Sequence, residues 1–446
     1  MKTSRTTPPH LLPILSVAFV GSLGFSIVLP FLVFVVTRLG GNALVYGAVG
    51  ATYSAFQLVG APVLGRWSDR YGRRRILLFS QVGTLLSWLI FLAALYLPVA
   101  TLAEVDTSLT GPFTLTLPLL VLFVARALDG VTGGNVSVAN AYLADVTTES
   151  DRSAGFGKMA VASNLGFVLG PAIAGLLGGS AMGEVPPVLA AIGVSVVATA
   201  IILFQLQDPA PCALPPKMER GAVGGALGLE HKECYAIVGP AVSLGAALRP
   251  TPIRVLLAVH FLVFLAFNFF YIAFPVHAAT ALEWTLIEVG IFFSTMGLLM
   301  AVVQGPVLSV AAKRYSDRSL VIVGGLLLAM SFVFFVSRSV PLIYTGTTLL
   351  ALGNGLMWPS LMAMIASAAG EQHQGAVQGF ASSSAAVASI TGLLLGGVLY
   401  GLLVDRVFLV AAIITAAAVG ASLGGISQAA PALTTLGSRQ QNREDT

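Results

Sequence analysis

Long apolar runs separated by short polar stretches make up the chain from about residue 11 to residue 427. A run of about 20 apolar residues can cross the hydrocarbon core of a bilayer as a helix. Because backbone polar groups must be paired inside lipid, runs of this length predict helices. A window of about 19 residues marks twelve candidate spans, near residues 11–36, 43–64, 75–97, 116–141, 155–179, 186–206, 253–279, 287–311, 319–338, 341–367, 375–401 and 404–427.

These runs predict an all-α membrane protein with twelve transmembrane helices. One long interruption follows the sixth span and is rich in Pro, Gly and charge. It divides the chain into a six-helix half (1–206), a cytoplasmic central loop (207–250), a second six-helix half (251–428) and a tail (429–446). The first run is longer than the core of a signal peptide and lacks a small-residue cleavage site, so it is expected to stay as a span.

The positive charges of the predicted loops indicate how the helices are oriented. Of the 23 Lys and Arg residues, Arg38, Arg338 and Arg406 lie on one side, and Arg126 lies within a span. All the others lie on the side that holds both termini. Since cytoplasmic loops carry the excess of Lys and Arg, both termini are predicted to be cytoplasmic, in a plasma (inner) membrane protein.

Composition supports the membrane assignment and excludes other classes. The chain is 56% hydrophobic and 9% charged, with a mean hydropathy of +0.90, far from the usage of soluble proteins. No nucleotide-binding loop is present, and no His/Asp metal cluster or Ser-His pair falls at membrane depth. Cys212 and Cys234 lack ligand spacing. An ATP-driven pump, an enzyme, a metal or cofactor site and a nucleic-acid partner are therefore not expected.

Short matches relate the two halves. The segment 61–65, Ala-Pro-Val-Leu-Gly, ends the second span and matches 305–309, Gly-Pro-Val-Leu-Ser, which ends the eighth. The same offset pairs Arg70 and Tyr71 with Arg314 and Tyr315. Internal repeats are typical of transporter folds. The matches therefore favour two pseudo-symmetric halves.

Arg126 and Asp129 are the candidate centre of the chemistry. An isolated charge near the middle of a membrane costs about 2.5–3.5 kcal/mol, so each charge needs a partner. Residues three apart share one face of a helix, so the two side chains are expected to pair. The pair either holds the fold as a fixed ion pair or exchanges a proton at Asp129, with Arg126 adjusting its proton affinity. We favour proton exchange because Asp129 is the one carboxylate well inside a predicted span.

Other polar and aromatic residues at membrane depth are candidates for a substrate cavity. His260 shares one face of the seventh span with two of them and is a candidate second proton site, because an unperturbed histidine titrates near neutral pH. The alternative is a hydrogen-bonded packing histidine. The cavity candidates are Gln57, Asn140, Asn164, Asn268, Tyr271, Gln304, Asn354 and Trp358.

The densest charge lies between the second and third spans, from Gly65 to Arg75. It has the form G-x-x-x-D-R-x-G-R-R, here Gly65, Asp69, Arg70, Gly72, Arg73 and Arg74. This resembles the signature loop of the major facilitator superfamily. The stretch 126–147 is similar to the fourth-helix motif of its tetracycline-type drug:proton antiporters. The fifth-helix antiporter motif of that branch resembles the segment carrying Gly166, Gly170, Pro171 and Gly175.

The resemblance implies a role for the charged loop. In this superfamily the loop after the second helix meets the end of the fourth, here at Asp145. We therefore expect Asp69, Arg73 and Asp145 to form an ionic latch that closes the cytoplasmic side. The alternative is that the basic cluster only reflects the positive-inside rule. That alternative does not explain Asp69 or the two glycines, Gly65 and Gly72.

The resemblance also implies a function: proton-coupled export of a small amphipathic compound or drug by alternating access. Tetracycline exporters carry an acidic residue early in helix one, where this chain has Gly21, Ser22 and Gly24, which argues against tetracycline itself. An importer or facilitator of a sugar or metabolite and a lipid transporter on the same fold are the alternatives. The expected partners are a small-molecule substrate, protons and the lipid bilayer, and the expected state is a monomer.

Overall fold

The computed structural model describes residues 11–107, 110–133, 135–147, 149–180, 182–206, 251–369 and 374–427. The chain divides into two compact units. The first unit comprises Met1–Val238 with Ala278–Gly297, and the second comprises Gly239–His277 with Leu298–Thr446. Two of the boundaries between the units therefore fall within helices, one in Thr251–Thr280 and one in Leu286–Val302.

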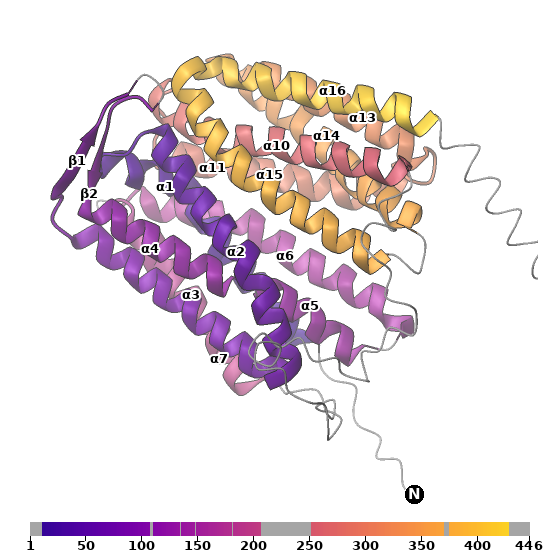
Figure 1. The fold of residues 1–446 in the computed structure, drawn as a ribbon, viewed down its shortest axis with the longest axis horizontal. Coiled ribbons are helices and arrows are strands. Elements are labelled where there is room, and N and C mark those ends of the chain that lie inside the picture. The colour runs from indigo at the N-terminus through magenta and orange to yellow at the C-terminus, as the bar shows by residue number, and fades with distance from the viewer. Residues whose placement is uncertain are drawn as a thin grey trace, which may run out of the picture. The chain divides into compact units, whose positions relative to one another are not determined.

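The first unit is a bundle of helices (Figure 1). Its helix α1 packs on α6 and α7, while α4 packs between α2 and α3. Pro residues occupy the first turns of α1, α4 and α7, where a missing backbone N–H costs nothing. The helices are α1 (Leu12–Arg38), α2 (Ala43–Tyr71), α3 (Arg73–Tyr96), α4 (Leu117–Thr132), α5 (Asn135–Val146), α6 (Glu149–Gly178) and α7 (Val185–Phe204).

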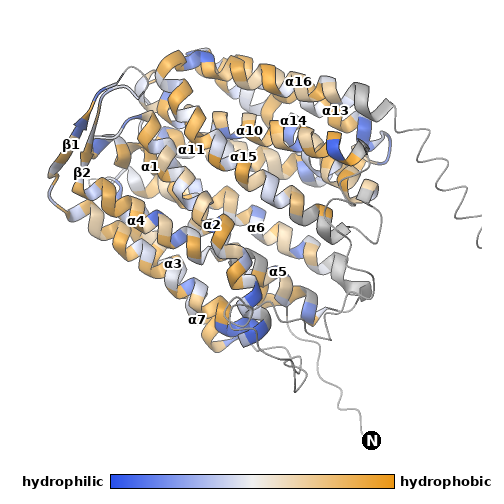
Figure 2. Ribbon diagram, viewed as in Figure 1, coloured by the Kyte–Doolittle hydropathy of each residue, from blue (hydrophilic) through white to orange (hydrophobic). Residues whose placement is uncertain are grey.

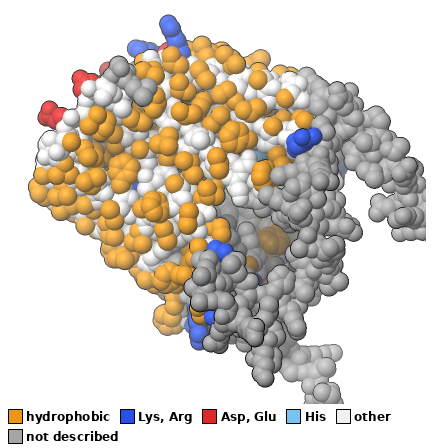
Figure 3. Space-filling view, in the orientation of Figure 1, with side chains coloured by type: hydrophobic (Ala, Val, Ile, Leu, Met, Phe, Trp, Pro, Cys, Tyr) orange, Lys and Arg blue, Asp and Glu red, His pale blue; other side chains and the backbone are white. Residues whose placement is uncertain are grey.

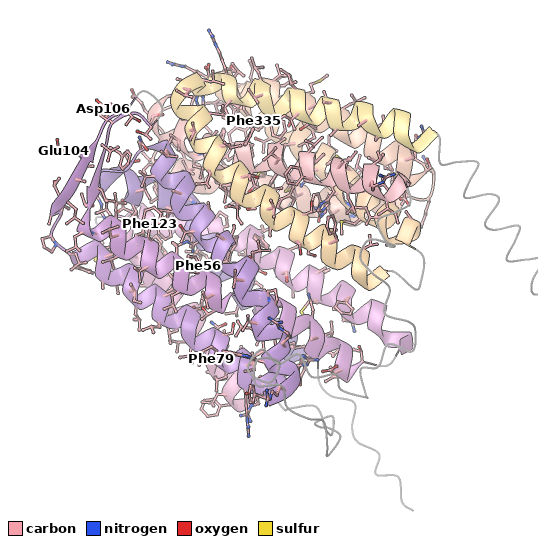
Figure 4. All side chains as sticks on the ribbon, in the orientation of Figure 1. Phe56, Phe79, Glu104, Asp106, Phe123 and Phe335 are labelled. Atoms are coloured by element: carbon pink, nitrogen blue, oxygen red, sulfur yellow. The ribbon has the colours of Figure 1, made fainter. Side chains whose placement is uncertain are left out.

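A β-hairpin connects α3 and α4, in the stretch between the predicted third and fourth spans. Strand β1 (Thr101–Val105) pairs antiparallel with β2 (Phe113–Thr116). Backbone and side-chain hydrogen bonds fasten the hairpin to the turn between α1 and α2, including Thr114 N to Gly40 O at 2.8 Å. Figure 4 shows the acidic residues Glu104 and Asp106 on this hairpin.

An apolar core closes one end of the first unit. Its buried side chains come from the start of α1, α3 and α6 and from the end of α2, α5 and α7, as in Ile14, Leu77 and Leu143. By the charge distribution, this is the predicted cytoplasmic end. The charged stretch predicted as a loop lies at this end, but it is helical on both sides of Gly72: residues 65–71 end α2 and residues 73–75 begin α3. Burial of apolar surface there supports these helix ends.

The remaining helices belong wholly or in part to the second unit: α10 (Thr251–Thr280) up to His277, α11 (Leu286–Val302) from Leu298 onward, α12 (Leu308–Ala311), α13 (Asp317–Phe334), α14 (Val340–Ala369), α15 (Gln374–Leu403) and α16 (Val407–Ser427). The last residues of α10 and the first part of α11 cluster with the first unit. A π-helical turn, η2 (Val303–Val307), joins α11 to α12 around Pro306. A 3₁₀ turn, η3 (Val404–Arg406), joins α15 to α16.

Aromatic rings in tilted contact fill the core of the second unit. Phe270 lies 4.7 Å from Phe335 between ring centroids and 5.9 Å from Phe332. Phe335 and Phe408 are also in contact, and Figure 4 labels Phe335 among these helices. Such pairs add to the hydrophobic gain of burial.

The fold is that of a helical membrane protein, and every predicted span falls on a helix or on two helices in succession. In the described part, eight helices are long and apolar enough to cross a membrane, or up to nine if a bent pair counts as one. Two of the differences from the predicted twelve have identifiable causes. A turn at Gly133 divides the predicted fourth span into α4 and α5, and one apolar stretch, Phe380–Ser422, runs across two predicted spans.

The distribution of hydrophobic residues over the surface is that of a membrane protein. Figure 2 shows hydrophobic residues along the middle of the helices and hydrophilic ones toward helix ends. Figure 3 shows hydrophobic side chains over most of the described surface on that face, with few charged ones. Phe56 and Phe79, labelled in Figure 4, are 45% and 54% exposed. Exposed aromatic side chains of this kind are compatible with contact with the lipid bilayer.

Candidate functional site

Arg126 and Asp129 form an ion pair on α4, with 2.9 Å between Arg126 Nη1 and Asp129 Oδ2. The two residues are 6% and 8% exposed. They come together because three residues span nearly one helical turn. Two opposite charges at this depth offset part of each other's cost of leaving water.

Side chains from α2 and α3 surround the pair. The Arg126 guanidinium lies over the Tyr53 ring, 4.7 Å from its centroid, in a cation–π arrangement. The hydroxyls of Thr84 and Ser87 face the Asp129 carboxylate. Arg126 Nε has no hydrogen-bond partner among the described residues. The pair is therefore held by three helices and retains one unused donor.

Gln57 connects α2 to α4 beside the pair. Its Nε2 donates to Tyr53 Oη at 3.0 Å and to the Gly133 carbonyl at 3.1 Å. A side chain at Gly133 would lie 3.0 Å from Tyr53 Oη. The glycine therefore lets α4 approach α2 closely at this polar contact.

A cavity of about 330 Å³ opens directly on Asp129. Helices α1, α2, α3, α4, α6 and α7 all contribute to its wall, so it lies within the first unit. Aromatic rings and small polar groups predominate. The lining residues are Val20, Gly21, Ser22, Gly24, Phe25, Tyr53, Gln57, Gln81, Thr84, Trp88, Asp129, Gly133, Ser163, Phe167 and Ser195.

Two of the residues singled out from the first half line this cavity, Asp129 and Gln57. Three others are not part of the lining: Arg126 pairs with Asp129 outside it, Asn140 is half-buried on α5 and Asn164 is exposed on α6. The cavity also contains residues that sequence reasoning missed. Gln81 and Trp88 lie on one face of α3 at a spacing of seven. This helical spacing in the third predicted span could have indicated that both residues line the same surface.

Candidates in the second unit fall into two groups. His260 is 2% exposed, and its ring lies 5.9 Å from that of Phe264 and 5.0 Å from that of Trp358. Its Nδ1 has no hydrogen-bond partner in the described part of the chain. Asn268 Nδ2 donates to the Phe264 carbonyl at 2.7 Å, while its Oδ1 accepts from Ser389 at 3.2 Å.

The remaining second-unit candidates are less enclosed. Tyr271 stacks on Phe267 at 5.7 Å. Gln304 lies in the π-helical turn η2, next to Gly355 of α14, and π-turns often occur at functional sites. Asn354 and Trp358 are half-buried on α14. These residues remain candidates for substrate contact.

The charged loop forms a connected set of contacts at the end of the first unit. Gly72 has φ +98° and links α2 directly to α3, a conformation that glycine adopts without strain. Arg73 pairs with Asp145 at 2.8 Å and donates to Ser68 Oγ at 2.7 Å. Arg74 donates to the carbonyls of Ile202 and Leu203 at the end of α7.

The other loop residues have separate positions. Arg70 lies over the Tyr71 ring at 5.4 Å, and a side chain at Gly65 would meet no other atom within 4 Å. The side chain of Asp69 lies outside the described part of the structure. The structure therefore describes a pair between Arg73 and Asp145, and Asp69 stays a prediction.

The glycines of the fifth-span motif lie where helix backbones touch. A side chain at Gly166 would lie 2.5 Å from the Phe19 carbonyl oxygen of α1, and the Gly166 carbonyl accepts from Ser26 at 3.0 Å. Gly170 packs against Ser26 in the same way. Gly175 and the Pro171 carbonyl lie against Gly290 of α11.

Neither cysteine lies in the described residues, and within those residues no group of three His, Cys, Asp or Glu could hold a metal ion. The polar groups at Asp129 are a carboxylate, a guanidinium, hydroxyls and amides. Together they can hold or release a proton and bind a small molecule.

Comparisons with known proteins agree with this geometry. The family profile described as Major Facilitator Superfamily matches residues 14–306 and 256–436. The chain is similar to the tetracycline resistance protein, class C, of Escherichia coli, at 28% identity over 356 residues covering 80% of each chain.

Two solved structures share the fold. The crystal structure of the human organic anion transporter MFSD10 matches with a TM-score of 0.62 and 21% identity, over 93% of this chain and 100% of that one. A variant of the nucleoside transporter NupG matches with a TM-score of 0.66 and 11% identity, over 93% of this chain and 99% of that one.

Proposed function

The chain belongs to the major facilitator superfamily, and we propose that it exports a small amphipathic compound in exchange for protons. Members of this family are multi-pass membrane transporters of small molecules and not enzymes. Export of a drug-like compound is supported by the relatives named as tetracycline resistance proteins. The names of the two similar structures mention different substrates, organic anions and nucleosides. We therefore infer the class of compound from the residues that line the cavity.

The position of Asp129 carries the proposal. Of the acidic side chains that the structure describes, it is the one that is buried, and it opens on the cavity. Protonation of its carboxylate removes the negative charge that Arg126 pairs with at 2.9 Å. The ion pair then weakens, and the protein has two arrangements of this centre whose populations a proton can shift. His260 is proposed as a second proton site.

The pair between Arg73 and Asp145 is proposed as part of a latch at the cytoplasmic side. It joins the first turn of α3 to the end of α5, and Ser68 and Gly65 of α2 extend the network. Together with Asp69, the latch closes the inside when the outside is open. In this scheme residues 1–206 and 251–428 act as the two moving halves of a monomer in the plasma membrane, with cytoplasmic termini.

The test is transport by full-length protein reconstituted in liposomes under an imposed pH gradient, with a panel of aromatic drugs offered as substrates. For the parent protein we expect uptake that rises with the gradient and proton movement in the opposite direction. Asp129→Asn should remove the dependence on the gradient while leaving the protein inserted. Asp317→Asn, the same change at an exposed carboxylate on α13, serves as the control.

The outcomes separate the candidates. Full gradient dependence in Asp129→Asn would falsify proton exchange at this residue and favour a fixed ion pair. Uptake that follows only the substrate gradient in the parent protein would favour the alternative of a facilitator or importer on the same fold.

A further inference from the structure

Gln81 of α3 is a buried side chain with an unused acceptor. It is 2% exposed, lines the cavity beside Asp129, and its Oε1 has no hydrogen-bond partner within the described residues. A buried amide oxygen without a partner loses its hydrogen bond to water and gains nothing in exchange. A ligand in the cavity that donates a hydrogen bond would restore what burial removes.

Gln57, the other amide of the cavity, shows the contrast. It donates both to Tyr53 Oη and to the Gly133 carbonyl. Its role is therefore to join α2 to α4. Gln81 makes no such connection among the described residues, and its side chain is part of the cavity lining.

The cavity wall around Gln81 suits a flat apolar body. Phe25, Tyr53, Trp88 and Phe167 supply rings from four different helices, and Phe25 already contacts Tyr53 and Phe167 at 5.2 and 5.9 Å between centroids. Pockets that bind small molecules combine such walls with a few polar groups that fix orientation. The volume of about 330 Å³ accommodates a small fused-ring compound.

The charge of the site argues against a cation as its ligand. Asp129 is the one formally charged lining residue, and its Oδ2 already bonds Arg126 at 2.9 Å. The hydroxyls of Thr84 and Ser87 face the same carboxylate. A ligand cation would therefore meet a neutral ion pair and the positive guanidinium behind it. Arg126 Nε also lacks a partner, but Arg126 is not part of the cavity lining. Among the described lining residues, the buried polar atom without a partner is a neutral acceptor, Gln81 Oε1.

We infer that this cavity binds an uncharged aromatic compound whose N–H or O–H group donates a hydrogen bond to Gln81 Oε1. Gln81 then determines specificity by rejecting aromatic compounds that lack a donor, because such a ligand leaves the buried oxygen unpaired. The inference rests on the proposed function only where it identifies this ligand with the exported compound. Binding itself needs neither a proton gradient nor transport.

The experiment compares three probes that share one ring system: naphthol, which donates a hydrogen bond, methoxynaphthalene, which does not, and naphthyltrimethylammonium, which is a cation without a donor. Each is titrated calorimetrically at pH 7 into the purified full-length protein in detergent. For the parent protein we expect naphthol to bind about tenfold more tightly than methoxynaphthalene, the effect of one hydrogen bond, and the cation to bind most weakly.

Variants assign the difference to Gln81. Gln81→Leu should bind naphthol and methoxynaphthalene equally, and Gln81→Met, which keeps the length of the side chain, should do the same if the leucine variant folds poorly. Gln205→Leu, at an exposed position after α7, should keep the parent's discrimination. The comparison between variants also removes partition of the probes into the micelle.

Three results would overturn the inference: no binding of naphthol to the parent, tightest binding of the cation, or unchanged discrimination in both Gln81 variants. None of these bears on proton coupling, which Asp129→Asn tests in liposomes. A failure of coupling with intact discrimination would remove the proposed exchange mechanism and leave the ligand assignment in place.

Discussion

Arg73 and Asp145 are 72 residues apart in the sequence, yet Arg73 Nε lies 2.8 Å from Asp145 Oδ2. Arg73 is 5% exposed, and its Nη1 also bonds Ser68 Oγ. Ser68 in turn donates to the Gly65 carbonyl at 2.7 Å. One guanidinium therefore ties the ends of α2 and α5 to the start of α3.

Removing the carboxylate of this pair should destabilise the first unit. For Asp145→Asn we expect the free energy of unfolding to fall by about 2 kcal/mol, the worth of a charge-assisted hydrogen bond, because Arg73 stays buried without its counter-ion. Thermal unfolding of the purified protein measures the change. Arg75→Leu, at an exposed position of the same turn, should leave the unfolding temperature near that of the parent. Equal losses in both variants would count against a specific pair.

Contacts between residues on one helix could be predicted from their spacing in the sequence, whereas contacts between different helices could not. The pairing of Arg126 with Asp129 follows from a separation of three on one helix. Arg73 and Asp145 could be joined only through a family resemblance, because no periodicity connects residues on different helices. The spacing of Gln81 and Trp88 could have placed Gln81 on the cavity face of its helix, but it could not show that Gln81 Oε1 lacks a partner, because that depends on the packing of several helices.

Helix positions were predictable because apolar runs fix them, but breaks within helices were not. The repeat register pairs Pro62 with Pro306. The α-helix α2 continues through Pro62, whereas Pro306 lies in the π-helical turn η2. Proline removes one N–H from a helix in both places, and the surrounding packing decides how the backbone accommodates the loss. The hairpin between α3 and α4 likewise depends on bonds to the distant turn at Gly40.

Arg126 tests whether the buried pair is needed for folding. Arg126→Leu leaves the Asp129 carboxylate buried without its ion-pair partner, and we expect a loss of about 3–5 kcal/mol in the free energy of unfolding. In the double variant Arg126→Leu/Asp129→Leu no charge remains, so most of that loss should be recovered. Thermal unfolding of both variants at one pH measures the difference. A double variant as unstable as Arg126→Leu would mean that Arg126 acts mainly through its contact with the Tyr53 ring.

Close contacts between helices predict that replacing a glycine by alanine lowers stability at some positions and not at others. Gly166→Ala would bring a methyl group within 2.5 Å of the Phe19 carbonyl oxygen, so α1 and α6 must separate at a cost of about 1–3 kcal/mol. Gly193→Ala on α7, where a side chain meets nothing within 4 Å, should be neutral or slightly stabilising. Unfolding temperatures of the two variants provide the measurement. A similar response at both glycines would show that helix propensity, and not close approach, decides the effect.

Asn42 has two roles that two substitutions can separate. Its Oδ1 accepts from Val45 N at 3.1 Å and caps α2, while its Nδ2 donates to the carbonyls of Thr110 and Pro112 at 2.8 and 3.2 Å. Asn42→Asp keeps the cap and loses both donated bonds, so backbone amides of the β1–β2 hairpin should exchange hydrogen faster while overall stability changes little. Asn42→Ala loses both roles and should also cost about 1 kcal/mol for the missing cap. Hydrogen exchange followed by mass spectrometry distinguishes them, with peptides from α7 as the internal reference. Unchanged exchange of the hairpin in Asn42→Asp would mean that the backbone bond from Thr114 to Gly40 is enough to hold it.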